Sequence, residues 1–123
     1  MSEERTFTED EANRLLPVLS EALQRIQEAR EVILAGAEHI RRTANLDGGG
    51  QVSQEYWDAL QEVRRHLESF AEQGIILRDA DSGLVDFPSR RDGQDVFLCW
   101  RLGEERVGYW HPPETGFGGR RPL

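Results

Sequence analysis

The side chains that could bind a metal gather mainly in the C-terminal third of the sequence. His111 ends an aromatic segment, Asp86 lies inside another apolar segment, and Glu104 lies in the turn before His111. Glu62 lies on the shoulder of a predicted helix that covers this region. A histidine with two or three carboxylates suits iron, manganese or zinc, so we predict a metal site formed by His111, Asp86, Glu104 and Glu62.

The alternative for the same residues is structural. No tight ligand spacing such as HExxH is present, so His111 could simply hydrogen-bond a carboxylate while Glu104 serves as a turn residue. Asp86 would then form an ion pair, because an acid inside an apolar strand is costly unless it is paired. The candidate partners for Asp86 are Arg101, Arg120 and His111.

Cys99 is the only cysteine, which excludes an intramolecular disulfide. Its place between Leu98 and Trp100 is typical of a small buried apolar residue. Arg101 on the same strand face could lower the pKa of the thiol, but a nucleophile also needs a base and an oxyanion site. We therefore expect a structural role for Cys99.

Three classes of function remain open. The metal site could belong to a non-catalytic domain, or it could serve an enzyme in hydrolysis or oxygen chemistry. An enzyme should leave a ligand position open to a pocket, whereas a structural or storage site should be closed. The third class is a purely structural protein-protein interaction module.

All 15 basic residues are arginine, which excludes enzyme mechanisms that need a lysine amine.

The elements that position His111 are two strands predicted at 96–102 and 107–111, because both segments are rich in β-branched and aromatic residues. A short turn around Gly103 and Glu104 joins them. The expected cross-strand pairs are Leu102 with Val107, Trp100 with Tyr109, and Leu98 with His111. This register places His111 on the same face as Trp100 and puts Cys99 opposite Trp110.

Two amphipathic helices are predicted to cover this sheet. The first begins after Thr8, where Glu11 completes a capping box, and its apolar spacing continues to about residue 43. Pro17 should bend this helix or mark the start of its regular part. Ser53 caps the second helix, and Gly74 ends it.

The apolar stripe of the first helix continues further than a small sheet requires. Ile33, Ala37 and Ile40 lie on this extension, and we predict that they form a helical dimer contact. The glycine-rich segment 45–50 between the helices is expected to be a mobile loop, because a phosphate-binding loop would follow a strand and carry a lysine.

The remaining segments complete an α+β fold. Residues 75–78 read as an entry strand or a helix end, and 84–87 read as a strand stopped by Pro88. We predict one domain over residues 1–123, with a helical hairpin at 8–74 packed on a three- to four-stranded antiparallel sheet; the sheet and the C-terminal tail together occupy 75–123. The tail, Gly116 to Leu123, should wrap the sheet edge. Alternatively, its glycines and two arginines bind an anion or a partner's carboxylate, and the candidate residues for this are Arg120 in the tail and Arg101 before it.

Charge narrows the choice of partners. The 123 residues carry a net charge of −8. Residues 1–73 hold 15 acids and 8 arginines, and residues 74–123 hold 8 acids and 7 arginines, so the helical half is the acidic one. This balance argues against nucleic acid and against an anionic membrane surface. With no signal peptide and no long apolar run, the protein is expected to be cytoplasmic. The predicted contact between helices makes it a homodimer.

Several short motifs together resemble the bacterial domain-of-unknown-function family 2203. The residues that carry the resemblance are Phe7-Thr8, Glu11-Ala12-Asn13, Leu15-Leu16-Pro17, Gly74, Leu77, Asp79, Gly83-Leu84-Val85-Asp86-Phe87-Pro88, Leu98-Cys99-Trp100-Arg101, Gly103-Glu104, His111, Gly116-Phe117 and Gly119-Arg120. The combination covers nearly the whole chain apart from the middle loop. The resemblance implies no activity and brings no catalytic residue with it.

Overall fold

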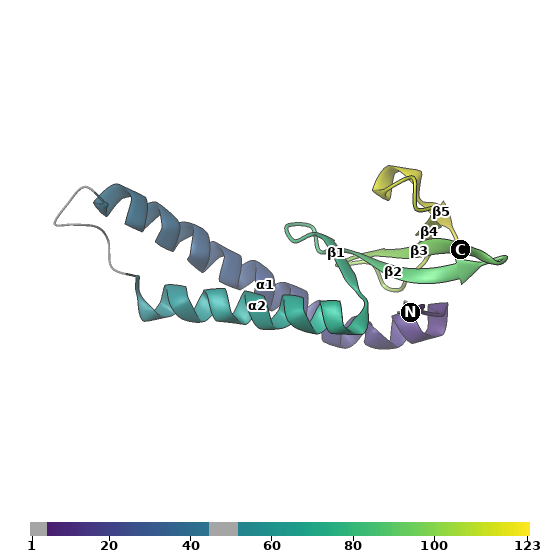
Figure 1. The fold of residues 1–123 in the computed structure, drawn as a ribbon, viewed down its shortest axis with the longest axis horizontal. Helices are drawn as coiled ribbons and strands as arrows, with labels where there is room; N and C mark the ends of the chain where they lie inside the picture. Colours follow the sequence, from purple (N-terminus) through teal and green to yellow (C-terminus); the bar gives the residue numbers. More distant parts are fainter. Residues whose placement is uncertain (1–4, 45–51) are drawn as a thin grey trace, which may run out of the picture.

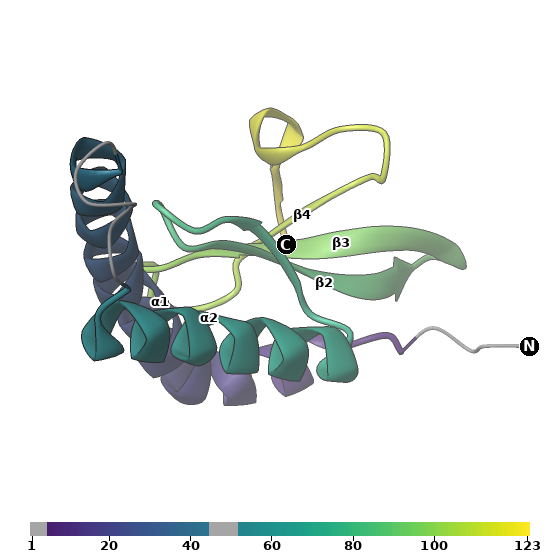
Figure 2. The same cartoon turned by 60° about the vertical axis from the view of Figure 1, so that its left-hand side comes forward.

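The computed structural model describes residues 5–44 and 52–123. Two long helices lie against one face of a five-stranded antiparallel sheet, in the order β1-β2-β3-β4-β5, and the C-terminal segment lies over the other face (Figures 1 and 2). The predicted α+β fold, a helical hairpin packed on a small antiparallel sheet, is confirmed, but the sheet has five strands instead of three or four, because residues of the tail add the short strand β5. The loop predicted at 45–50 lies outside the described residues.

Helix α1 (Glu9–Thr43) begins at the predicted capping box. The Thr8 hydroxyl accepts a hydrogen bond from the Glu11 amide at 3.1 Å, and the Glu11 carboxylate accepts one from the Thr8 amide at 2.9 Å. The bond from the Thr8 amide is the main cause that lowers the pKa of the Glu11 carboxyl. The helix continues through Pro17 without a break, so its regular part starts before the proline.

Helix α2 (Gln54–Gln73) is capped by Ser53 and ends at Gly74, as predicted. Gly74 has a φ of +80°, a left-handed conformation that glycine adopts at little cost. Both helices extend past the end of the sheet and spread apart there (Figure 1). We call this projecting part, the last turns of α1 up to Thr43 and the first turns of α2 from Gln54, the arm. No helix in the described part of the chain is long and apolar enough to span a bilayer.

The sheet is a meander of short strands. Its members are β1 (Ile76–Asp79), β2 (Leu84–Arg91), β3 (Gln94–Arg101), β4 (Tyr109–His111) and β5 (Arg121–Pro122). Asp92 and Gly93 join β2 to β3 with φ values of +52° and +77°, the two positive angles of a tight hairpin turn. The two-residue strand β5 puts the tail along the sheet edge, as the sequence suggested.

Strand β2 continues past Pro88, where we had predicted its end. Strand β1 pairs with β2 only at Leu84, Val85 and Asp86, so Pro88 lies beyond the last paired residue, where its missing N–H costs no ladder bond. The Pro88 carbonyl instead accepts a hydrogen bond from the Phe7 amide at 2.7 Å. The segment before α1 therefore lies against the open part of this strand.

The core lies between the helices and the inner sheet face. Strand alternation sends Val85 and Phe87 of β2, and Leu98 and Trp100 of β3, toward the helices, where all four are buried. They pack with an apolar stripe of α1 and with Phe70 of α2. The residues between them on each strand, among them Asp86 and Cys99, therefore point to the opposite, outer face.

The predicted register between β3 and β4 is wrong by one residue. The observed pairs are Phe97 with His111, Leu98 with Trp110, and Cys99 with Tyr109. Val107 does not pair with Leu102 but turns into the core, where its amide donates to Asn13 Oδ1 at 2.7 Å. Pairing therefore starts only at Tyr109, and every side chain of β4 changes face.

Candidate functional site

The corrected register brings three possible metal ligands together on the outer sheet face. Asp86 and Cys99 are direct partners across β2 and β3, and His111 of β4 pairs with Phe97, two residues from Cys99. A carboxylate oxygen of Asp86, the thiol of Cys99 and a ring nitrogen of His111 all lie within 4.8 Å of one another. Strands β2, β3 and β4 therefore each contribute one possible metal ligand. We call Asp86, Cys99 and His111 together the Asp-Cys-His cluster.

The cluster is closed to solvent. The exposed fraction is 2% for Asp86, 0% for Cys99 and 2% for His111. The C-terminal segment that follows β4 lies on the side of the sheet opposite the helices (Figure 2). No substrate can contact these three side chains without a movement of the segments around them.

Hydrogen bonds fix the orientation of the His111 ring. Its Nε2 lies 3.0 Å from Asp86 Oδ2, and its Nδ1 lies 2.9 Å from the Pro112 carbonyl oxygen. The Phe97 ring packs against it with the ring centres 5.5 Å apart. A backbone carbonyl on one ring nitrogen is the usual second partner of a metal-binding histidine, because it leaves the other nitrogen for the metal.

Asp86 has an arginine partner that the sequence did not single out. Arg78 of β1 donates from Nε to Asp86 Oδ2 at 2.8 Å, and its guanidinium stacks over the Phe97 ring at 5.1 Å. The candidate partners Arg101 and Arg120 do not contact Asp86; of the predicted set, only His111 does. Asp86 Oδ1 is buried and has no hydrogen-bond partner among the described residues, which is unusual for a carboxylate oxygen.

Cys99 is not a reactive thiol in this environment. Burial raises its pKa to about 12, and the Asp86 carboxylate beside it adds to the rise. Arg120 opposes the shift with a smaller effect. The thiol is therefore protonated at neutral pH, and only a group that displaces the proton, such as a metal ion, would convert it to a thiolate.

Glu104, a predicted ligand, is engaged elsewhere. Its Oε1 accepts a hydrogen bond from the Arg101 amide at 2.8 Å, and its Oε2 accepts one from Arg120 Nη2 at 2.7 Å. Its carbonyl accepts from Trp100 Nε1 at 3.0 Å. Glu104 therefore closes the loop between β3 and β4 instead of joining the cluster.

Glu62 also lies outside the cluster. It is half-buried on α2, and its carboxylate lies 3.4 Å from Arg65 Nη2, one turn along the same helix. The structure thus brings together two of the four predicted metal ligands, His111 and Asp86, and places Cys99 beside them.

The two arginines predicted to bind an anion have different environments. Arg120 pairs with Glu104 and lies over the rings of Tyr109 and Phe117, with 9% of its side chain exposed. Arg101 is exposed and stacks over Phe117. The Glu104 carboxylate therefore already occupies the position at which an external anion would bind Arg120.

One signal in the sequence could have revealed Cys99 as a possible ligand. The dipeptide Asp92-Gly93 is a strong mark of a two-residue hairpin turn, and such a turn pairs Arg91 with Gln94. Counting outward from that pair places Asp86 directly opposite Cys99. Nothing comparable in the sequence marks Arg78, which depends on how β1 packs at the edge.

Comparison with known proteins identifies the family but no characterised relative. No curated protein and no solved structure matches the chain. The family model described as "Uncharacterized conserved protein (DUF2203)" matches residues 5–123, essentially the whole chain, in agreement with the resemblance seen in its motifs. The chain is therefore a member of the DUF2203 family.

Proposed function

We propose that this protein binds one divalent transition-metal ion, zinc in preference to iron or manganese, in a closed, non-catalytic site formed by Asp86, Cys99 and His111. The observation that carries the proposal is the gathering of three buried ligand atoms within 4.8 Å of one another, in which the Cys99 thiol, a weak donor, is the polar neighbour left for the buried oxygen Asp86 Oδ1. An unpaired buried carboxylate oxygen is destabilising, and a cation would satisfy it.

The donor set favours zinc. Thiolate and imidazole ligands suit zinc, whereas manganese prefers oxygen ligands, and a carboxylate also binds zinc. The three side chains would fill three of the four zinc positions, and a buried water would fill the fourth. Zinc bonds of about 2.0–2.3 Å would place tetrahedral ligand atoms about 3.6 Å apart. The three ligand atoms of Asp86, Cys99 and His111 lie within 4.8 Å of one another, so small side-chain movements would bring them to this spacing.

Burial supports a structural role over catalysis. An enzyme of the hydrolytic or oxygen-using kind needs an open coordination position that its substrate can reach. Here Asp86, Cys99 and His111 are at most 2% exposed. A metal in this place would join β2, β3 and β4 and so stabilise the sheet.

Cobalt binding gives a direct test. The untagged protein, stripped with a chelator, is titrated with Co²⁺ and then with Zn²⁺. We expect one equivalent of cobalt, a near-ultraviolet thiolate-to-cobalt absorption band, and loss of that band when zinc is added. The Cys99→Ser variant should lose the band, and His111→Gln should bind at least about tenfold more weakly, as expected for the loss of one ligand.

His66→Ala is the matched control, because His66 is a half-buried histidine on α2 that lies outside the cluster. It should bind cobalt as the unchanged protein does. A cobalt spectrum without the thiolate band, or equal affinity in His111→Gln and the unchanged protein, would leave the cluster as an internal ion pair only. Circular dichroism of each variant confirms that it has folded.

We also propose that the protein self-associates through the arm. Leu34 of α1 and Trp57 of α2 expose 61% and 53% of their surface there, and large exposed apolar side chains often mark an interface. Ala37 is exposed beside them, whereas the predicted contacts Ile33 and Ile40 are half-buried. Trp57→Glu should convert a dimer to a monomer by light scattering, and a change at Val18, which is 70% exposed away from the arm, should not.

A further inference from the structure

The Arg120 side chain is buried on the outer sheet face, and one of its nitrogen atoms has no partner. Only 9% of the side chain is exposed, and its Nε atom is buried without a hydrogen-bond partner among the described residues. A buried N–H group without an acceptor is destabilising, because it has lost its bonds to water. Arg120 Nε is therefore a donor that an additional acceptor would stabilise.

Three contacts hold the Arg120 guanidinium in place. Its Nη2 donates to Glu104 Oε2 at 2.7 Å, and its Cζ lies 3.9 Å from the centre of the Tyr109 ring and 4.6 Å from that of the Phe117 ring. A guanidinium presents five N–H groups in a rigid fork, so the bond of Nη2 to Glu104 leaves Nε for a second acceptor. The position of Nε is therefore fixed before that acceptor arrives.

The Cys99 sulfur lies in the surroundings of Arg120. Tyr109, whose ring packs on the guanidinium, is the direct partner of Cys99 across β3 and β4. Side chains of directly paired residues stand on the same sheet face, with their Cβ atoms about 5 Å apart. Burial and the Asp86 carboxylate raise the pKa of the thiol, whereas the Arg120 charge acts to lower it. A thiol sulfur accepts hydrogen bonds only weakly, but a charged thiolate accepts them strongly.

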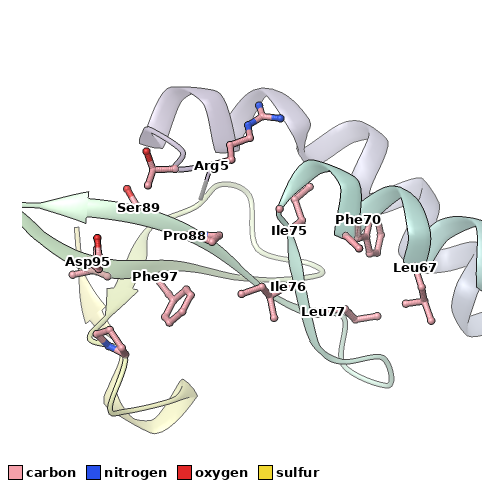
Figure 3. Close-up of a pocket in the computed structure, with 15 residues that line it drawn as sticks. Arg5, Leu67, Phe70, Ile75, Ile76, Leu77, Pro88, Ser89, Asp95 and Phe97 are labelled. Carbon is pink, nitrogen blue, oxygen red and sulfur yellow. The ribbon is translucent and has the colours of Figure 1, made fainter. Parts of the chain in front are cut away.

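The cavity shown in Figure 3 does not reach this sulfur. It has a volume of about 600 Å³, lies between α2, β1 and β2, and includes Phe97 and Pro113 in its lining. Its lining includes none of Asp86, Cys99, His111 and Arg120. Groups that support the sulfur of Cys99 must therefore come from the chain packed around it.

We propose that Arg120 is a positioning residue of the metal site, whose Nε donates a hydrogen bond to the Cys99 sulfur when that sulfur binds the metal ion. This role rests on the proposed metal site, because a metal-bound thiolate carries the negative charge that makes the bond charge-assisted. Glu104, which holds Nη2, supports the site through Arg120. Since Arg120 lies in the C-terminal tail and Cys99 in β3, the same bond attaches the tail to the site.

Cobalt spectra of the full chain test this bond. Co²⁺ is titrated into the chelator-stripped protein, and the thiolate-to-cobalt band of Arg120→Lys is compared with that of the unchanged protein. Lysine keeps the positive charge and can still pair with Glu104, but a methylene takes the place of Nε. A hydrogen bond lowers the energy of the sulfur electrons. Its loss should therefore move the band to longer wavelength and weaken cobalt binding about tenfold.

Arg120→Gln separates the N–H group from the charge, because its amide nitrogen lies as many bonds from Cα as Arg120 Nε does. Its band should stay closer to that of the unchanged protein than the band of Arg120→Lys does. Arg121→Lys is the matched control, since Arg121 is the exposed neighbour in the tail and stacks over Trp110 instead. It should leave the band and the affinity unchanged, and circular dichroism confirms that each variant has folded.

The outcomes separate this role from the metal site itself. The same band position and affinity in Arg120→Lys and Arg121→Lys would overturn the role of Arg120 and leave the metal site intact. A band that moves as far in Arg120→Gln as in Arg120→Lys would also overturn it, because the N–H group would then not be the cause. Absence of the thiolate band in the unchanged protein would overturn both proposals.

Discussion

Replacement of Asp86 by asparagine changes the charge of the cluster while keeping the shape of the side chain. Asp86 accepts hydrogen bonds from two cationic or polar groups, Arg78 and His111, at 2.8 and 3.0 Å. Both groups bond Asp86 Oδ2, so asparagine can keep its oxygen there as their acceptor and place its NH₂ group where Oδ1 stands. The variant therefore loses the charge-assisted part of both bonds but keeps the bonds themselves.

The burial of each partner sets the size of the effect. The side chains of Asp86 and His111 are 3% and 2% exposed, and a buried hydrogen bond to a charged group contributes about 1.5–3 kcal/mol. The side chain of Arg78 is 44% exposed, so its ion pair is screened by water and contributes about 1 kcal/mol or less. Because a neutral acceptor keeps part of each contribution, we expect Asp86→Asn to lower the free energy of unfolding of the metal-free protein by about 2 kcal/mol.

Urea denaturation at neutral pH, followed by circular dichroism with a chelator present, measures this change. The control is Asp81→Asn, which breaks an ion pair with Arg30 at a side chain that is 74% exposed and should cost about 1 kcal/mol or less. Zinc at a hundred times its dissociation constant should then add about 2.7 kcal/mol to the unchanged protein and less to Asp86→Asn. Equal losses in the two variants would refute the reasoning that burial makes the Asp86 contacts strong.

Other predictions concern the thiol, the loop before β4 and one turn. Cobalt affinity should rise about tenfold per pH unit between about pH 6 and 8, since the pKa of Cys99 is about 12 and binding must displace its proton; a flat profile by competition titration would contradict thiolate ligation. Asn13→Ala should cost about 1–2 kcal/mol in urea denaturation, because the amide of buried Val107 loses its acceptor. Gly83→Ala should cost about 1–3 kcal/mol, because Gly83 has a φ of +71° and a Cβ there would lie 2.6 Å from the Leu102 Cβ; an unchanged melting temperature would contradict this.

Local signals in the sequence determined the helices and most of the strands. The capping box at Thr8 sets the start of α1, and Gly74 sets the end of α2, through short-range hydrogen bonds and backbone conformation. Both helix ends lie where predicted. Alternation of apolar residues identified the inner face of β3, with Leu98 and Trp100 buried. The Asp92-Gly93 turn also contained the register that joins Asp86 to Cys99.

The register of β4 could not be read from local signals. In the folded chain Val107 is buried in the core, and its amide donates to Asn13 of α1, a residue far away in the sequence. Strand pairing with β3 then starts at Tyr109. The one-residue shift moves His111 from the face of Trp100 to the face of Cys99, and so it decides which side chains His111 can meet.

The sequence by itself thus determined the elements, their caps, their apolar faces and the family, because short-range hydrogen bonding and periodic burial govern these features. Only the tertiary structure decided that Glu104 closes a loop, that Arg78 reaches Asp86, and that Asp86, Cys99 and His111 share one closed space. These outcomes depend on which strands pair and on where the loop before β4 is held, and contacts between distant residues fix both.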